Sequence, residues 1–259
     1  MKINPNQLRK HVLNMVFEKK SGHIGGSFSI AELVAYLYSN FNLIEKGKDK
    51  LILSKGHAVP ILYAVLYELG LIKNLNDFRE INSPLQGHPD KERLPYMHAT
   101  TGALGQGLSI AIGHAIACKL KKLDNSIFCI IGDGETQEGQ IWEALMLAPK
   151  YDLDNLICFV DANGAQNDGY VKDILDLGDL QLKIKSFGWE TYSINGNDLE
   201  ELSTTMNSLK KSGKPICIIL NTTKGKGVSF MGSPAWHAKV PSKEEYVNAM
   251  LELDDESNS

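Results

Sequence analysis

Two hydrophobic runs of this sequence each end in a polar side chain that can bind a hard metal ion. Asp133 lies in a Gly132-Asp133-Gly134 turn after one run, and Asn163 follows another run about thirty residues later. Mg²⁺ prefers carboxylate and carboxamide oxygens, and it usually completes its shell with phosphates of a substrate or cofactor. We therefore predict a magnesium diphosphate site with Asp133, Asn163 and the carbonyl near Ala165 as metal ligands. Gly134 would let a phosphate approach the backbone. The alternative is two ordinary turns, because Asp, Asn and Gly are common turn residues.

Three histidines lie beside glycines in loops between predicted helices and strands. His23 occurs in SGHIGGS, His57 in LSKGHA and His88 in GHPD. An imidazole can donate or accept a proton near neutral pH, so three that converge could polarise the carbonyl and hydroxyl groups of a sugar. Any one of them alone is more often an ordinary hydrogen-bonded histidine.

The elements that must position these residues alternate between helices and strands. Helices are predicted over residues 5–19, 58–69, 104–117, 138–150, 176–187 and 198–211, and two more open at the capping patterns Ser29 with Glu32 and Ser242 with Glu245. Strands are predicted over 50–53, 126–131, 155–161, 189–194 and 215–220. The fold class is therefore α/β, with a parallel sheet covered by helices on both faces. In such sheets ligands bind beyond the carboxyl ends of the strands, where Asp133 and Asn163 fall.

Two segments stand out from this alternation. Residues 81–101 contain three prolines and little periodicity, which predicts a long functional loop. Residues 104–117 are apolar almost all round, as in a helix buried in the middle of a domain.

Composition limits the class of protein. The 259 residues are 43% hydrophobic, which suits one large domain over 1–259, with 253–259 as a frayed tail. A net charge of −4 and the absence of a basic stripe argue against nucleic acid, and no apolar run is long enough to span a membrane. The amino-terminal residues lack a signal-peptide core, so we expect a cytoplasmic protein. Four widely separated cysteines are expected to be buried and reduced.

Seven motifs in a fixed order give the chain a family resemblance. SGHIGGS, LSKGHA, GHPD, TTGALGQG, GDGETQEGQIWEA, NLICFVDANGAQNDG and TKGKGVSFM resemble the amino-terminal half of a transketolase, over about residues 5–240. The resemblance implies thiamine diphosphate and Mg²⁺ as cofactors, with Gly102 and Leu104 offering backbone groups to the aminopyrimidine. Glu138, otherwise a favourable charge at a helix start, would also contact a cofactor-activating glutamate of the partner.

The resemblance assigns the histidines as well. His88 would face the first-carbon hydroxyl of the donor, and His23 and His57 would line the substrate channel. His237 would lie near the diphosphate, although Trp236-His237-Ala238 departs from the WHG sequence usual in the split forms. His11 and His114 are expected to be structural, and His98 is a weaker candidate than the others.

The implied function is the amino-terminal subunit of a split transketolase. It would transfer a two-carbon ketol unit from a ketose phosphate to an aldose, in an α₂β₂ assembly with a carboxy-terminal subunit that supplies the pyrimidine-binding domain, which lies beyond the end of this sequence. Pentose phosphate metabolism is the expected setting. One alternative is a specialised transketolase-like enzyme or, more distantly, the α subunit of a 2-oxo acid dehydrogenase, which the histidine motifs disfavour. Another is a non-catalytic cofactor-binding subunit, which the intact Asp133, Asn163 and Glu138 disfavour.

Basic residues suggest where a sugar phosphate would be held. Arg9, Arg79 and Arg93 are the only arginines. Because bidentate phosphate binding favours arginine, we expect the partner to grip the phosphate. Lys224 and Lys226 could approach the diphosphate, but they lie in a lysine-rich loop that we expect to be solvated.

Overall fold

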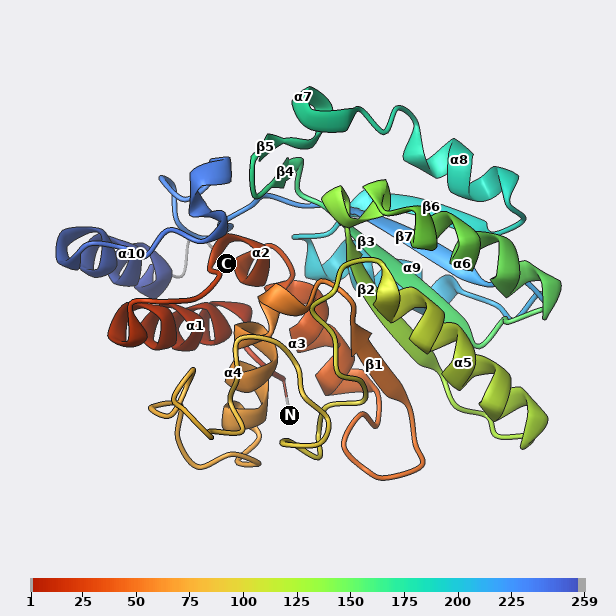
Figure 1. Ribbon diagram of the computed structural model, residues 1–259, viewed down its shortest axis with the longest axis horizontal. Coiled ribbons are helices and arrows are strands. Elements are labelled where there is room, and N and C mark those ends of the chain that lie inside the picture. The colour runs from red at the N-terminus through yellow and green to blue at the C-terminus, as the bar shows by residue number, and fades with distance from the viewer. Residues whose placement is uncertain (1, 256–259) are drawn as a thin grey trace.

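A five-stranded parallel sheet forms the centre of the protein, whose computed structural model describes residues 2–255 (Figure 1). The strands are β1 (Lys50–Leu53), β2 (Ile127–Gly132), β3 (Leu156–Ala162), β6 (Glu190–Asn195) and β7 (Ile216–Asn221). They lie in the order β1-β2-β3-β7-β6, so β7 is inserted between β3 and β6. A two-stranded antiparallel ribbon of β4 (Ala165–Gln166) and β5 (Gly169–Tyr170) follows β3.

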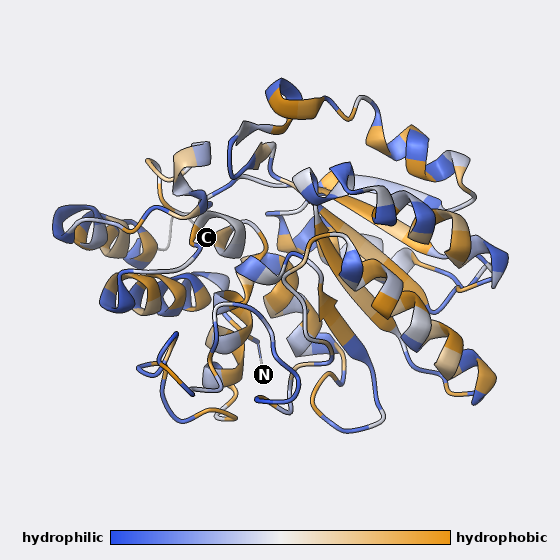
Figure 2. Ribbon diagram, viewed as in Figure 1, coloured by the Kyte–Doolittle hydropathy of each residue, from blue (hydrophilic) through white to orange (hydrophobic). Residues whose placement is uncertain are grey.

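Helices cover both faces of this sheet, as the sequence predicts. The α-helices are α1 (Pro5–Lys19), α2 (Gly25–Phe28), α3 (Ala31–Asn40), α4 (Pro60–Glu68), α5 (Gln106–Leu120), α6 (Gly139–Lys150), α7 (Val171–Leu175), α8 (Leu180–Ser186), α9 (Leu199–Ser208) and α10 (Lys243–Asp254). Three short 3₁₀ turns are η1 (Gly56–Ala58), η2 (Gly134–Gln137) and η3 (Pro234–His237). Figure 2 shows the strands as largely hydrophobic, which is typical of a sheet with both faces buried.

Alternate residues along each strand supply two separate cores. On one face, Phe128 and Phe159 pack with helices α1, α3 and α4. On the other face, Cys129, Cys158 and Cys217 lie in register on β2, β3 and β7, beneath α5, α6 and α8. These cysteines are buried free thiols, and Cys118 is too, so the expectation of reduced, buried cysteines is confirmed.

Several local predictions need correction. Ser29 does not cap α3, because it ends α2 and the N-cap position of α3 is Ile30; its hydroxyl group donates to the carboxylate of Asp161 on β3. Helix α5 is not enclosed on all sides, since Gln106 and Gly113 within the predicted span 104–117 are exposed. The predicted helix 176–187 begins only at Leu180, after Asp179 caps α8. Residues 176–179 are not helical, and Gly178 among them has a φ of +56°.

The ends of the chain agree with the predictions in part. Ser242 and Glu245 form the predicted capping box of α10. That helix continues to Asp254, so residues 253 and 254 are helical rather than part of a tail, and 256–259 lie outside the described residues. Within residues 2–255, no helix is long and apolar enough to cross a membrane.

Candidate active site

The carboxyl ends of β2 and β3 place Asp133 against the backbone of Gly164. Oδ1 of Asp133 accepts a hydrogen bond from the Gly134 N–H over 2.8 Å, and Oδ2 accepts one from the Gly164 N–H over 2.6 Å. The side chain is buried and has no ion-pair partner among residues 2–255. Burial and the neighbouring Asp161 carboxylate raise the pKa of Asp133 to about 6. A buried acid held by amides alone is suited to receiving a cation.

Asn163 is oriented by a buried carboxylate that the sequence did not single out as functional. Its Nδ2 donates to Oδ2 of Asp161 over 2.7 Å, and its Oδ1 accepts from the Ala165 N–H over 3.1 Å. Asp161 also accepts from Lys55 Nζ (2.5 Å), the Ser29 hydroxyl (2.7 Å) and a third partner, the Thr222 hydroxyl. Burial opposes ionisation, yet Lys55 and these hydroxyl groups hold the pKa of Asp161 below its usual range.

The backbone carbonyl of Ala165 is the third predicted metal ligand, and it contacts Lys224. Nζ of Lys224 donates to this oxygen over 2.9 Å and lies 3.4 Å from Nδ1 of His237. Lys224 is 2% exposed, so the expectation of a solvated lysine is wrong. Burial and the charge of Lys55 lower the pKa of Lys224 to about 8. A cation therefore lies beside the predicted diphosphate position.

Three of the predicted histidines form one cluster. The ring centroids of His23 and His57 are 5.3 Å apart, those of His23 and His237 are 5.2 Å apart, and those of His57 and His237 are 4.7 Å apart. Burial is the main cause that lowers the pKa of His23 to about 4, that of His237 to about 3, and that of His57 well below 6.5. All three rings are therefore neutral at pH 7.

His88 lies apart from this cluster, against the loop that carries Gly102. A Cβ atom at Gly102 would be 3.0 Å from the His88 ring, and the φ of Gly102 is +142°, so glycine is required there on both counts. His88 is exposed. Burial of part of its ring, with the charge of Arg79, lowers the pKa of His88. The long loop predicted over 81–101 thus brings a histidine to the predicted aminopyrimidine-binding segment.

Glu135, which the sequence analysis did not single out, connects the segment around residues 102–105 to the sheet by hydrogen bonds. Its carboxylate accepts hydrogen bonds from the Ser54 hydroxyl (2.5 Å), the Gly105 N–H (2.8 Å) and the Gly132 N–H (3.1 Å). Burial raises the pKa of Glu135, and these donors oppose that rise. Glu135 is the acid of GDGE, directly after a buried strand, which was the available signal. Leu104, one residue before Gly105, remains 39% exposed.

Glu138 opens helix α6, as predicted, but its side chain makes no capping hydrogen bond. The residue is exposed at the rim of a cleft of about 280 Å³. The cleft gathers most of the predicted site and its new members, namely Lys55, His57, Leu104, Gly132, Asp133, Gly134, Glu135, Gln137, Glu138, Asn163, Ala165, Gln166, Asn167, Asp168, Lys224 and His237.

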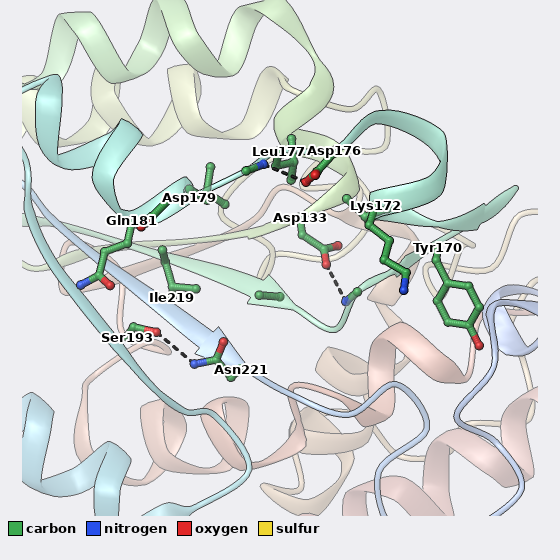
Figure 3. Close-up of a pocket in the computed structure, with 15 residues that line it drawn as sticks. Asp133, Tyr170, Lys172, Asp176, Leu177, Asp179, Gln181, Ser193, Ile219 and Asn221 are labelled. Atoms are coloured by element: carbon green, nitrogen blue, oxygen red, sulfur yellow. Dashed lines mark hydrogen bonds between the residues drawn. The ribbon is translucent and has the colours of Figure 1, made fainter.

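A second hollow, of about 560 Å³, lies on the other side of Asp133 (Figure 3). It is bounded by the segment from Tyr170 to Gln181 and by the ends of β6 and β7. Figure 3 shows Asp133 at this hollow, with its carboxylate accepting the hydrogen bond that Gly164 donates. Asp133 lines both hollows, whereas Gly164 lines only the larger one.

The residues of the cleft fit a metal-bound diphosphate. A carboxylate, a carboxamide and a carbonyl form the oxygen donor set that suits Mg²⁺, and Lys224 beside them suits a phosphate. Oε1 of Gln166 is buried in the cleft wall without a hydrogen-bond partner among the described residues. Nδ1 of His23 also lacks one, and the His23 ring lies behind the cleft against His57 and His237. Such buried atoms usually find partners, so both are available to a ligand.

Comparison with known proteins identifies the family of the chain. Residues 2–252 match the family described as "Transketolase, thiamine diphosphate binding domain". The chain is 42% identical to the 6-deoxy-6-sulfo-D-fructose transketolase subunit SqwG of Clostridium sp. (strain MSTE9), covering 97% of this chain and 95% of that subunit. It is 40% identical to an apulose-4-phosphate transketolase subunit of Actinobacillus succinogenes, covering 96% of this chain and 93% of that subunit.

A solved transketolase structure supports the same family assignment. The transketolase of Campylobacter jejuni superimposes with a TM-score of 0.91 at 33% identity, over 96% of this chain and 42% of that one. This chain therefore corresponds to less than half of a full-length transketolase. It belongs to the transketolase family, as the amino-terminal part that binds thiamine diphosphate.

Proposed function

We propose that this chain is the diphosphate-binding subunit of a heteromeric transketolase, active with a second subunit that carries the pyrimidine-binding domain. The observation that carries the proposal is the meeting of Asp133, Asn163 and the Ala165 carbonyl, the metal-ligand set, with a cluster of neutral histidines. Two relatives that the chain covers almost from end to end are named as subunits, which supports a partner. An α₂β₂ assembly would pair two such sites.

In this proposal Asp133, Asn163 and the Ala165 carbonyl would hold Mg²⁺, which would supply positive charge for the cofactor diphosphate. Asp133 would be the charged ligand, and Asn163 and the Ala165 carbonyl the neutral ones. Lys224 already contacts that carbonyl, so its ammonium group is placed to neutralise an adjacent phosphate oxygen. Gly102 and Leu104 offer backbone groups on the aminopyrimidine side, and Glu138 at the rim would meet the partner.

Thiamine diphosphate supplies the carbon chemistry when bound. The protein's part is to hold the sugar and move protons. Nδ1 of His23 has no hydrogen-bond partner among the described residues, so it can accept or donate a proton at a sugar oxygen. His57 and His237 keep neutral rings beside it, and His88 approaches from the Gly102 loop. A neutral imidazole can accept a hydrogen bond from a sugar hydroxyl at one ring nitrogen and donate one from the other.

The test is to co-purify this chain with its carboxy-terminal partner and assay ketol transfer from xylulose 5-phosphate with thiamine diphosphate and Mg²⁺. We expect turnover by the complex and none by the chain alone. Turnover by the isolated chain would contradict the need for a partner. A complex that binds the cofactor but transfers no ketol unit from any donor would instead support a non-catalytic subunit.

A specialised sugar donor is the second candidate. Two relatives are named for 6-deoxy-6-sulfo-D-fructose and apulose 4-phosphate rather than for a common pentose phosphate. Assays of the complex with both sugars beside xylulose 5-phosphate would rank the donors by kcat/KM. A preference of tenfold or more for one of the unusual sugars would favour this candidate over a pentose phosphate role.

A further inference from the structure

One of the three arginines has no carboxylate partner among the described residues. Arg9 is buried in an ion pair with Glu32, with 2.6 Å between Nη2 and Oε2. Arg93 pairs with Asp90 at the surface, with 3.3 Å between Nε and Oδ2. For Arg79, no Asp or Glu of residues 2–255 lies within ion-pair distance. Arg79 is therefore the guanidinium group left available for an anion.

The backbone of Arg79 adopts an unusual conformation. Its φ is +59°, a left-handed conformation that is unfavourable for a residue other than glycine. The Arg79 N–H donates to the Leu85 carbonyl over 2.8 Å, which closes the loop between them. Strained residues of this kind persist where the surrounding structure requires them, often at binding sites.

The guanidinium group lies between the two loops that carry His23 and His88. Nη1 of Arg79 donates to the Ser21 hydroxyl over 2.6 Å, two residues before His23. On the other side, a Cβ atom at Gly87, directly before His88, would be only 2.8 Å from Nη2. The charge of Arg79 contributes to the lowered pKa of both His23 and His88, so it acts at the site and not at a distant surface.

The guanidinium group of Arg79 has N–H donors that are available for a ligand. A guanidinium group has five N–H donors in a fixed fork. The Ser21 hydroxyl takes one of them, and Nε is buried without a partner among the described residues. The side chain as a whole is only half-buried, so a ligand can reach it. A tetrahedral oxyanion matches both the charge and the fork.

We propose that Arg79 binds the terminal oxyanion of the sugar substrate, a phosphate or a sulfonate. The inference rests on the proposed ketol transfer and deepens it. It also revises the expectation that only the partner grips this group, because this subunit contributes a guanidinium of its own. Arg79 would then help to determine which sugars are accepted, by favouring those with an anionic end.

The test compares charged and neutral donors in the assembled complex. Arg79→Gln should raise KM for xylulose 5-phosphate or 6-deoxy-6-sulfofructose roughly 10- to 100-fold, as expected for the loss of a charged hydrogen bond. KM for unphosphorylated D-xylulose should change less than about twofold. Arg79→Lys should restore part of the loss, since it keeps the charge but not the fork. Arg93→Gln, which removes an arginine of the same region that lies in a surface ion pair, is the matched control.

The outcomes separate this inference from the proposed function. If Arg79→Gln raises KM only for the phosphorylated donor, Arg79 binds a phosphate, and if it raises KM only for the sulfonated donor, Arg79 binds a sulfonate. A rise in KM for both donors means that Arg79 binds either oxyanion. An equal rise in KM for charged and neutral donors would overturn the inference and show that Arg79 has a structural role. Weaker binding of the partner subunit with unchanged KM would overturn it in favour of an interface contact. A wild-type complex without activity on any donor would count against the proposed function instead.

Discussion

The carboxylate of Asp161 accepts a hydrogen bond from the side-chain amide of Asn163, with 2.7 Å between Oδ2 and Nδ2. The same carboxylate forms an ion pair with Lys55 in which both side chains are at most 2% exposed. Asp161 thus links a buried cation to a predicted metal ligand. Because the amide nitrogen of Asn163 donates to Asp161, the carboxamide oxygen is the atom available to the predicted metal.

Asp161→Asn should weaken magnesium-dependent cofactor binding without removing any proposed ligand. Partners that orient metal ligands typically contribute 10- to 100-fold to affinity, and we expect a loss in this range. The free energy of unfolding should also fall by about 3–5 kcal/mol, because Lys55 is left buried without its counter-charge. Calorimetric titration and chemical denaturation would measure the two effects. Wild-type affinity in the folded variant would contradict the orienting role.

Asp133→Ala should abolish the magnesium dependence of cofactor binding, because the metal loses its only charged protein ligand. Asn163→Ala should act in the same direction but more mildly. Titration of thiamine diphosphate into the complex, with and without Mg²⁺, provides the measurement. Asp168→Ala is the matched control, since Asp168 is an exposed carboxylate of the same cleft. An equal loss of magnesium-dependent affinity in both aspartate variants would indicate a general effect of negative charge and not a metal site.

His88→Ala should reduce catalysis and leave folding intact. His88 is exposed, so its removal should change the melting temperature by little. A lost acid or base group should lower kcat/KM for the ketose by roughly 10²-fold. Steady-state kinetics beside a thermal melt would decide the matter. A large fall in melting temperature with normal turnover would show that the histidine is structural.

Acid should destabilise this protein through its buried histidines, and His98 offers the clearest case. Its Nδ1 lies 3.1 Å from the Leu51 nitrogen, and burial lowers the pKa of His98 to about 4. Below pH 6.5 the unfolded chain binds a proton that the folded chain refuses until about pH 4. The free energy of unfolding therefore falls as pH drops through this window, by up to about 3 kcal/mol for this group.

His98→Asn tests this account, because its Oδ1 can replace Nδ1 as the acceptor but does not titrate. Urea denaturation from pH 7 to pH 4 should show a shallower loss of stability in the variant than in the wild type. If the variant and the wild type lose stability equally between pH 7 and pH 4, titratable groups other than His98 cause the acid destabilisation. His23, whose pKa is also about 4, should likewise lower the free energy of unfolding as the pH falls.

Much of the fold was predictable from local pattern. Strands 126–131, 155–161, 189–194 and 215–220 were each expected one residue before their observed bounds, because a buried parallel strand appears as a continuous apolar run. The turns after two of these runs correctly marked Asp133 and Asn163 as neighbours at the sheet edge. Their role as metal ligands stays a prediction.

The residues that the sequence reading missed or undervalued share one cause. Lys224 reaches Ala165 because β7 lies beside β3, and the order of strands in a sheet cannot be read from their apolar pattern. Arg79 reaches the histidine loops through a left-handed backbone turn at a residue that gives no local sign of it. Ser29 looked like a helix cap because Asp161, its true acceptor, is 132 positions away.

Local pattern was enough to specify the five strands of the central sheet and most of the longer helices, where the polar ends of the strands fall, and to which family the motifs belong. Periodicity and turn chemistry are local, so they can be read along the chain. Which charges are buried, and what they contact, depended instead on the three-dimensional arrangement: Asp161 meets Lys55, Glu135 meets Gly105, and Arg79 lies between two loops. The physical reason is that the free energy of a buried charge depends on its partners in space, and strand order and loop closure bring those partners together.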